Sequence, residues 1–425
     1  MTDRRLLLLI PTTSYRADDF LDSAQRMGVP VTVGSDRSSV LAQLDPAATL
    51  HVPFARPDEA VARIAAFHAD HPLAAIVGVD EGTTTIAARA SHRLGLPHND
   101  PEAVATAGDK YRFRRCLDAA GVPQPTARLF DAATDGLAAG RQVNRYPVVL
   151  KPLGLAASRG VVRADDAQGF ADAFARIRAI LAETDTATGL STAPYILAED
   201  YMAGGEVALE GLLIAGRLHV LALFDKPEPM TGPTFAETIF TTPSRLPTAV
   251  QDQVIARTEA AVAAVGLTDG PVHAELRLTP DEGPVPLELA ARAIGGLCSR
   301  VLRYGAGLSL EDVILAHALR RDPGELARAG DPAGVMMLPV PRAGRLRAVT
   351  GQDAARAVPG IVDLSITVAP GTHVRPLPEG DRYLGFLFAR ASTPDAVESA
   401  LRTAADRLEA VFAGARCDQV GSPDR

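Results

Sequence analysis

Short apolar runs alternate with amphipathic stretches over the first hundred residues. Apolar residues 6–10, 29–33 and 74–79 each fit a buried strand, and apolar positions at helical spacing follow the first run. Asp80 and Glu81 come directly after the third run. Strands that alternate with helices predict a parallel sheet, and ligands gather at the carboxyl ends of such strands. We therefore expect a parallel α/β unit with an acidic pair at its ligand-binding edge.

The middle of the chain carries a longer series of helix and strand patterns. Caps and breakers delimit them, because Asp favours the start of a helix and Gly its end. In chain order we expect a helix capped by Asp109 and closed at Gly121, a strand at 146–152, a helix with Phe170, Phe174 and Ile177 on one face, a polar loop at 183–192, a strand at 195–198, a hairpin of 206–214 and 218–224, and a helix with Val254, Thr258 and Val262 that ends at Gly266.

The last hundred residues differ in composition. Gly and Pro become more frequent after about residue 330, which is typical of short strands and turns. A strand at 383–389 and a helix that carries Val397, Leu401, Leu408 and Val411 complete the pattern. We expect a smaller α+β unit here.

Composition and charge narrow the class of protein. Apolar residues make up 47% of the 425 positions, which argues for a sizeable core and against global disorder. The formal net charge of -8 argues against a dedicated nucleic-acid binder, because such a protein carries a basic stripe. A local cluster of Lys and Arg can still hold an anionic substrate.

Cysteines and apolar runs indicate the compartment. Cys116, Cys298 and Cys417 are too few and too scattered for a disulfide framework or a zinc site. Residues 6–10 are too few for a signal-peptide core, and no apolar stretch is long enough to cross a bilayer. We expect a cytoplasmic protein with reduced thiols.

The first candidate for chemistry is the segment VVLKPLGLAASRGV. A strand delivers Lys151, and the loop after it contains Gly154, Ser158 and Gly160. Backbone N–H groups of such a loop can surround a phosphate, and a lysine adds a positive charge. An ordinary mobile loop after a strand explains the pattern equally well.

The second candidate is ILAEDYMAGGEVALEG. An apolar strand ends in Glu199, and Glu206 follows after two glycines. A strand edge can present backbone groups to adenine, and a carboxylate can accept hydrogen bonds from ribose hydroxyls. Taken alone, the pattern favours a surface turn with solvated acids.

The third candidate is the pair of apolar segments VHAELRL and PLELAAR. Each carries a glutamate, Glu275 and Glu288, and strand alternation puts His273 on the same face as Glu275. Two inward carboxylates on adjacent strands suit Mg²⁺, which bridges carboxylates and nucleotide phosphates. Arg292 follows and can reach an oxyanion or a phosphate. The alternative is a buried salt bridge between Arg292 and one of the two glutamates.

Taken in order, these elements resemble the ATP-grasp superfamily, and the likeness covers roughly residues 100–320. The individual motifs are modest, but the ordered set is specific. The resemblance implies that Lys110 and Lys151 contact the nucleotide phosphates, Ser158 and Gly160 belong to the loop that covers them, Glu199 and Met202 form the adenine hinge, Glu206 binds the ribose, and Glu275 and Glu288 bind Mg²⁺.

Two further motifs, FAETIFTTPS and ELAARAIGGLCSR, are most similar to those of L-amino-acid ligases and related carboxylate–amine ligases. By that likeness Glu237 faces a substrate amino group, and Arg292 and Gly295 border the acyl phosphate. Phe240 stands where some of these ligases carry a polar residue, so their substrate preference does not transfer.

One position departs from the family pattern. Many ATP-grasp enzymes place Asn two residues after the second metal-binding glutamate, where this chain has Ala290. The departure weakens the ligand set for one of two metal ions. The site remains, because Glu288 can bridge both ions.

The resemblance implies an α/β ATP-grasp fold in three parts. Residues 1–100 would form a Rossmann-like N-terminal domain, residues 101–330 the ATP-grasp core with a lid at about 145–200, and residues 331–425 a C-terminal α+β domain. The implied enzyme uses ATP and Mg²⁺, with Mn²⁺ as a substitute, and joins a small carboxylate to an amine through an acyl phosphate. It implies no nucleic-acid or membrane partner and leaves a homodimer open.

Two other functions compete with the ligase. One is a carboxylase that activates bicarbonate, as biotin carboxylase does, and the other is a nucleotide-binding regulator without turnover. Retention of both metal carboxylates, both lysines and Arg292 argues against the regulator.

Some positions keep a structural interpretation beside the functional one. Cys298 fits a small packing residue better than a nucleophile, since its local sequence offers no basic partner. His273 fits either a positioning residue or a structural histidine. Asp80 and Glu81 either line the substrate pocket or cap the next helix.

Overall fold

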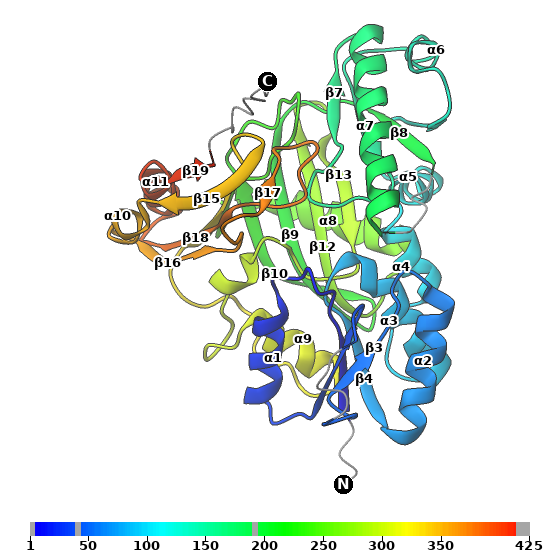
Figure 1. The fold of residues 1–425 in the computed structure, drawn as a ribbon, viewed down its shortest axis with the longest axis vertical. Helices are drawn as coiled ribbons and strands as arrows, with labels where there is room; N and C mark the ends of the chain where they lie inside the picture. Colours follow the sequence, from blue (N-terminus) through cyan, green and yellow to red (C-terminus); the bar gives the residue numbers. More distant parts are fainter. Residues whose placement is uncertain (1–4, 39–43, 189–193, 414–425) are drawn as a thin grey trace, which may run out of the picture.

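The N-terminal part is a parallel four-stranded sheet between two layers of helices (Figure 1). The computed structural model describes residues 5–38, 44–188 and 194–413. Leu6 and Leu8 pack in one apolar cluster with Phe20, whereas Leu7 and Leu9 pack in another on the opposite face. Alternation along a strand thus explains why a continuous apolar run is buried on both sides. The elements are β1 (Arg5–Leu9), α1 (Ala17–Arg26), β2 (Val31–Ser35), β3 (Thr49–His51), α2 (Pro57–Asp70), β4 (Leu73–Gly78) and α3 (Glu81–Leu94), with strand order β3-β2-β1-β4.

Two short helices lead from this sheet to the next part of the chain. They are α4 (Pro101–Ala107) and α5 (Lys110–Ala119). The side chain of Asp109 accepts hydrogen bonds from the backbone N–H groups of Tyr111 and Arg112, both at 2.9 Å. The predicted helix cap is confirmed, and it fixes Lys110 at the first turn of α5.

A small antiparallel sheet with two helices forms the projection at the upper right of Figure 1, which includes the predicted lid at 145–200 and is called the lid below. Its elements are β5 (Ala127–Asp131), α6 (Gly136–Gly140), β6 (Val148–Pro152), β7 (Val162–Ala164), α7 (Ala167–Thr188) and β8 (Tyr195–Asp200), with strand order β5-β8-β6-β7. The polar loop predicted at 183–192 is wrong in its first half, because α7 continues to Thr188. The remainder of that loop, 189–193, lies outside the described residues.

An eight-stranded antiparallel sheet forms the centre of the molecule. The predicted hairpins are confirmed as pairs of neighbouring strands in it. Its strands, in the order β13-β12-β9-β10-β11-β14-β18-β16, are β9 (Gly205–Ile214), β10 (Arg217–Lys226), β11 (Ile239–Thr242), β12 (Gly270–Thr279), β13 (Gly283–Ala290), β14 (Ala333–Leu338), β16 (Ile361–Ile366) and β18 (Gly385–Arg390). Strands from beyond residue 330 therefore continue the sheet that the middle of the chain begins.

Helices and a second small sheet complete the fold. They are α8 (Thr248–Val265), the 3₁₀ helix η2 (Cys298–Val301), α9 (Leu310–Ala318), β15 (Gly344–Thr350), α10 (Gln352–Arg356), β17 (His373–Val374), α11 (Pro394–Ala405) and β19 (Glu409–Phe412). The helix predicted to carry both Val397 and Val411 ends at Ala405. Val411 lies in β19 and pairs with Ala348, so that part of the prediction is wrong.

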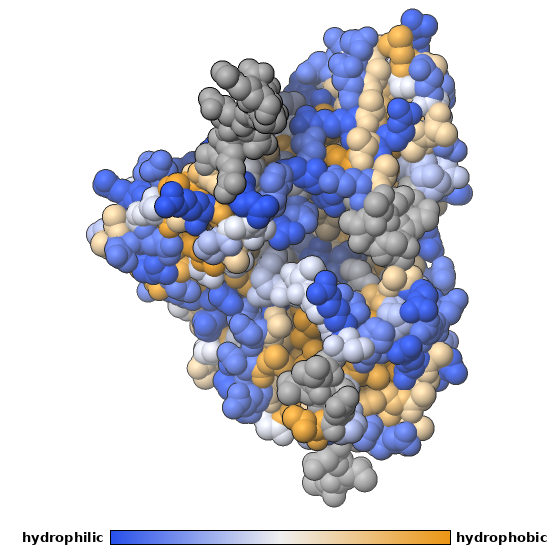
Figure 2. Space-filling model, viewed as in Figure 1, coloured by the Kyte–Doolittle hydropathy of each residue, from blue (hydrophilic) through white to orange (hydrophobic). Residues whose placement is uncertain are grey.

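One large apolar cluster joins the N-terminal sheet to the central sheet. Leu6 and Leu8 share it with Phe224, Phe240 and Phe386, all nearly inaccessible to water. Burial of this kind stabilises by about 25 cal/mol per Å² of apolar surface. Figure 2 shows the hollow that remains between these parts and the lid. Within the described residues, no helix is both long and apolar enough for a membrane span.

Candidate active site

A cavity of about 370 Å³ lies where the N-terminal sheet, the lid and the central sheet meet. Its walls include Tyr15 from the N-terminal part, Ser158 from the lid and Tyr383 from the C-terminal region. Of the residues that the sequence singled out for the site, Gly154 and Gly160 do not line the cavity. Those that do are Lys110, Lys151, Ser158, Glu199, Met202, Glu206, Glu237, Glu275, Glu288, Arg292 and Gly295. Their individual roles remain predictions.

The two predicted metal ligands lie opposite each other. Glu275 of β12 pairs in register with Glu288 of β13, and both line the cavity. Adjacent antiparallel strands bring opposed side chains within a few ångströms. The two carboxylates form a donor set of hard oxygens, which is the chemistry that Mg²⁺ requires. Ala290 pairs with His273 two positions further along the strands, and its side chain offers no ligand atom.

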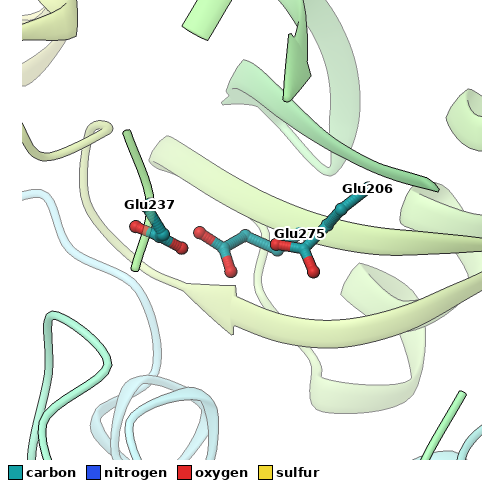
Figure 3. Close-up of side chains that lie close together, drawn as sticks. All are labelled: Glu206, Glu237 and Glu275. Carbon is teal, nitrogen blue, oxygen red and sulfur yellow. The ribbon is translucent and has the colours of Figure 1, made fainter. Parts of the chain in front are cut away.

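A buried lysine that the sequence analysis missed stands among three carboxylates. Figure 3 shows Glu206, Glu237 and Glu275 converging, and one oxygen of each lies within 4.8 Å of the others. Lys226, at the end of β10, places its Nζ 2.7 Å from Glu237 and 3.5 Å from Glu275, and it also pairs with Glu206. A single cation thus neutralises part of a strongly acidic cluster. The signal in the sequence was a lysine that ends the strand pattern of 218–224.

These contacts change how the groups titrate. Burial opposes the charge of Lys226, yet the carboxylates of Glu206 and Glu237 raise its pKa well above the ordinary value. Burial, together with the negative charge of Glu275, raises the pKa of Glu237 to about 8. Glu237 is therefore a carboxyl that can hold or release a proton near neutral pH.

The carboxylate of Glu206 is engaged by protein groups in this structure. One oxygen pairs with Lys226, and the other lies 2.9 Å from Nη2 of Arg277. Its side chain is 3% exposed. The predicted contact with ribose stays a prediction, and it would have to share this carboxylate with two buried cations.

Glu199 holds two basic groups at the entrance to the lid. Its carboxylate lies 2.6 Å from Nζ of Lys151 and 2.6 Å from Nε of Arg114, and Arg114 in turn donates to the carbonyl of Leu287. Burial alone would raise the pKa of Glu199, but these two cations lower it to about 2. The side chain thus fixes Lys151 toward the cavity.

The strand that carries Glu199, at one end of the predicted adenine hinge, is paired on both sides. β8 lies between β5 and β6, so the strand offers no free edge. The expectation of an exposed strand edge at Glu199 is therefore wrong. Backbone groups for a base would come from the segment after Asp200, in which Tyr201 and Met202 line the cavity.

The loop after Lys151 makes a tight turn over the cavity. Ala157 and Ser158 have φ values of 56° and 55°, and Gly160 has 72°, so three residues of this loop are left-handed. Such strain at non-glycine residues is typical of functional loops. The N–H of Gly160 donates to the carbonyl of Pro378 at 2.9 Å, and Nζ of Lys110 donates to the carbonyl of Leu155 at 3.0 Å.

The acidic pair after β4 serves both purposes that the sequence left open. Asp80 forms a capping box with Thr83 at the start of α3. Glu81 reaches Arg292, with 2.7 Å between its Oε2 and Nε of the arginine. The salt bridge of Arg292 is therefore made with the N-terminal part and not with Glu275 or Glu288.

His273 and Cys298 fit structural roles. His273 lies 3.5 Å from both Glu210 and Glu275, and although burial lowers its pKa, these carboxylates raise it to about 9. Cys298 is fully buried, and burial raises the pKa of its thiol. A thiol without access to water or a base is a packing group, as the sequence indicated. Cys417 lies outside the described residues.

Comparisons with known proteins agree with this arrangement. The chain matches the models of the ATP-grasp N-terminal domain at residues 21–98, the ATP-grasp domain at 144–301 and the L-amino acid ligase C-terminal domain 2 at 336–413. The uncharacterized protein y4rH of Sinorhizobium fredii is 23% identical over 418 residues, 96% of this chain and 83% of that protein.

Two relatives have a described activity. Alanine–anticapsin ligase of Bacillus subtilis is 28% identical over 240 residues, which cover 54% of this chain and only 50% of that ligase. The crystal structure of an L-amino acid ligase from Bacillus licheniformis superposes with a TM-score of 0.82 at 24% identity, covering 97% of this chain and 100% of the other. At that identity the superposition establishes the fold.

The chain belongs to the ATP-grasp superfamily, because the matched domains, the lid and the shared cavity occur together in its fold. Within the superfamily it is an ATP-dependent ligase of the class that forms carbon–nitrogen bonds, similar to carboxylate–amine ligases. Its substrates are small molecules, as those of the related ligases are.

Proposed function

We propose that this protein joins the carboxylate of one amino acid, or of an amino-acid-like acid, to the amine of a second substrate. The observation that carries the proposal is the shared cavity, whose walls combine Lys110 and Lys151, the opposed Glu275 and Glu288, Arg292 and Glu237. Phosphate-binding cations, a metal-binding pair and an acid for an ammonium group are the parts that such a reaction needs.

The first step would transfer the terminal phosphoryl group of ATP to the substrate carboxylate. A carboxylate oxygen attacks the γ-phosphorus, the bond to the β-phosphate oxygen breaks, and ADP leaves. Bound Mg²⁺, held by Glu275 and Glu288, would neutralise phosphate charge. Lys151, oriented by Glu199, and Arg292, oriented by Glu81, stabilise the same charge from the protein side.

The second step would form the amide. The amine attacks the carbonyl carbon of the acyl phosphate, inorganic phosphate leaves, and the amine loses a proton. The loop at Ser158 covers the cavity and limits the access of water to the intermediate. Glu237, which pairs with Lys226, would hold the ammonium group of the acid substrate.

Trapping with hydroxylamine tests the function directly. Because hydroxylamine attacks acyl phosphates, a panel of amino acids with ATP and Mg²⁺ should give a hydroxamate and an equal amount of ADP for at least one acid. Release of AMP in place of ADP would contradict the mechanism. ADP release with bicarbonate, and no hydroxamate from any acid, would support the carboxylase instead, and no release at all would support a regulator.

Glu237→Gln tests the placement of the acid substrate. The variant replaces the ionisable carboxyl beside Lys226 with a neutral amide and keeps the side-chain volume. We expect the KM for the activated amino acid to rise at least tenfold while the KM for ATP changes less than threefold. An effect confined to ATP would remove Glu237 from this role.

A further inference from the structure

Basic side chains in the cavity differ in whether they have a carboxylate partner. Three of the five lysines and arginines that line it form ion pairs at 2.6–2.9 Å: Lys151 with Glu199, Arg277 with Glu206 and Arg292 with Glu81. In the described part of the chain, Lys110 and Arg16 have no carboxylate oxygen within 4.0 Å. The predicted ligand of Lys110 is the nucleotide phosphate, which leaves Arg16 without an assigned partner.

Arg16 is a buried cation with an unused donor. Its residue is 2% exposed, and its Nη1 donates to the carbonyls of Val79 at 3.0 Å and Ala293 at 3.4 Å. Its Nη2 has no hydrogen-bond partner in the described residues. A guanidinium cannot lose its proton to escape burial, so an unpaired donor on it is costly unless a ligand supplies the acceptor.

Glu210 is a buried carboxylate whose charge interacts with that of Arg16, but the two groups form no direct ion pair. Glu210 is completely buried, and its Oε2 accepts from the N–H of Ile294 at 2.9 Å. Its ion-pair partner is His273 at 3.5 Å, and no ion pair with Arg16 forms within 4.0 Å among the described residues. Nη2 of Arg16 and Oε1 of Glu210 thus both lack a hydrogen-bond partner among the described residues, and Arg16 has a donor left for a ligand in the cavity that it lines.

The neighbours of Arg16 indicate which wall of the cavity such a ligand would contact. Tyr15, the preceding residue, accepts a hydrogen bond from the N–H of Gly296 at 3.0 Å, which leaves its hydroxyl proton available. Both residues lie beside the segment 292–296, which begins with Arg292. The two donors thus adjoin the region where the acyl phosphate would be consumed.

We propose that Arg16, with the hydroxyl of Tyr15, binds the carboxylate of the amine-donating substrate, so that this substrate is an amino acid and not a simple amine. The inference rests on the proposed function and names the class of its second substrate. The activated acid would use Arg292 and Glu237 for its own carboxyl and ammonium groups. Its carboxyl is converted into the amide, whereas Arg16 suits a carboxylate that stays charged throughout.

The unmodified enzyme provides the first test. Each of the twenty standard amino acids is offered as amine donor beside its own primary amide, with saturating acid and ATP, and ADP release is measured. Amines of the amides are less basic, so concentrations are expressed as free amine. A hydrogen-bonded ion pair implies about 10- to 100-fold higher kcat/KM for the acids. Equal kcat/KM for acids and amides would overturn the proposal.

Two substitutions of Arg16 test whether this residue causes the preference for amino acids over their amides. In Arg16→Met, the kcat/KM for each amino acid should be within about twofold of the kcat/KM for its amide. Arg16→Lys should restore part of the preference for the acids. Arg300→Met is the matched control, since Arg300 pairs with Asp19 at the same domain junction and does not line the cavity. It should keep the wild-type preference for the acids. If Arg16→Met does not fold, the comparison of acids with amides decides alone.

Other outcomes separate this inference from the function beneath it. A preference for acids that persists in folded Arg16→Met would overturn the role of Arg16 while leaving the ligase intact. An equal loss with acids and amides in Arg16→Met would show that the residue only balances Glu210. Absence of ADP release with every amine and with hydroxylamine would overturn the proposed function, and this inference with it.

Discussion

Single residues in the cavity act mainly through the charges that surround them. Lys226 is an example, because its buried ammonium group forms ion pairs with three glutamates. Removing one partner from such a cluster leaves uncompensated charge, which costs more than the intact cluster contributes. Glu81 and Glu199 have the same effect on Arg292 and Lys151, since each orients a cation toward the cavity.

Glu275→Gln and Glu288→Gln should each lower turnover at least 100-fold. The amide has the same shape but binds a divalent ion much more weakly than a carboxylate. Glu282→Gln, in the exposed turn between the same strands, is the control and should keep wild-type activity. Steady-state ADP release and thermal unfolding of all three variants are the measurements. Near-normal turnover in both strand variants would remove the metal assignment.

Glu199→Gln should destabilise the protein by about 3–5 kcal/mol at pH 7, because Arg114 and Lys151 lose their buried partner. The pKa of Glu199 is about 2 in the folded protein against an ordinary 4.5. Its stabilisation is therefore complete above pH 4.5 and is lost as the pH falls toward 2.

Urea unfolding of both proteins at pH 7, 4.5 and 3 measures this effect. The difference in free energy of unfolding between the wild type and Glu199→Gln should be the same at pH 7 and pH 4.5 and smaller at pH 3. Glu102→Gln, whose salt bridge with Arg112 lies on the surface, should change stability by less than 1 kcal/mol. A difference that grows on acidification would contradict the pairing.

At the level of elements, the lid is tied to a loop from the far end of the chain. The N–H of Gly160 donates to the carbonyl of Pro378, and Arg176 of α7 pairs with Glu379. A second salt bridge joins Glu183 to Arg375 at 2.9 Å. The lid therefore contacts the C-terminal region as well as lining the cavity.

Amide hydrogen exchange rates should respond to nucleotide in one part of the loop after Lys151 and not in the other. The N–H of Gly160 already has a partner, so it should exchange slowly with and without nucleotide. The N–H groups of 154–158 should be slowed at least tenfold by an ATP analogue with Mg²⁺, because the phosphates supply the acceptors. Site-resolved exchange measures this, and equal rates at 154–158 in both states would contradict phosphate binding by the loop.

At the level of the whole molecule, the central sheet crosses the division predicted near residue 330. β14 pairs with β11, and β18 pairs with β14, so the C-terminal strands are part of the same layer. Val335 and Phe388 share an apolar cluster with Leu6 and Leu8 of the N-terminal sheet. Three distant parts of the sequence thus enclose one core.

Truncation after residue 330 should therefore prevent folding of the remainder. It would expose the edge of β11 and remove Val335 and Phe388 from the shared cluster. We expect a chain of residues 1–330 to be insoluble or to lack a cooperative thermal transition, as measured by circular dichroism. The full-length protein, measured in parallel, is the control and should show a cooperative transition. A cooperative, soluble 1–330 would show that the predicted C-terminal domain is independent.

The sequence by itself determined the local elements and most of the predicted residues that line the cavity. Local patterns were enough to predict three features, because periodicity, capping and turns act over a few residues. These features are the buried strand Leu6–Leu9, the Asp109 cap and the hairpin with Glu275 and Glu288. Only the tertiary structure decided what depends on pairing across the chain: Lys226 among its glutamates, Glu81 on Arg292, and Arg16 with a free donor. Charges are partnered by whichever group the fold brings near, and strand order, such as the interior place of β8, is set by long-range contacts that no local pattern encodes.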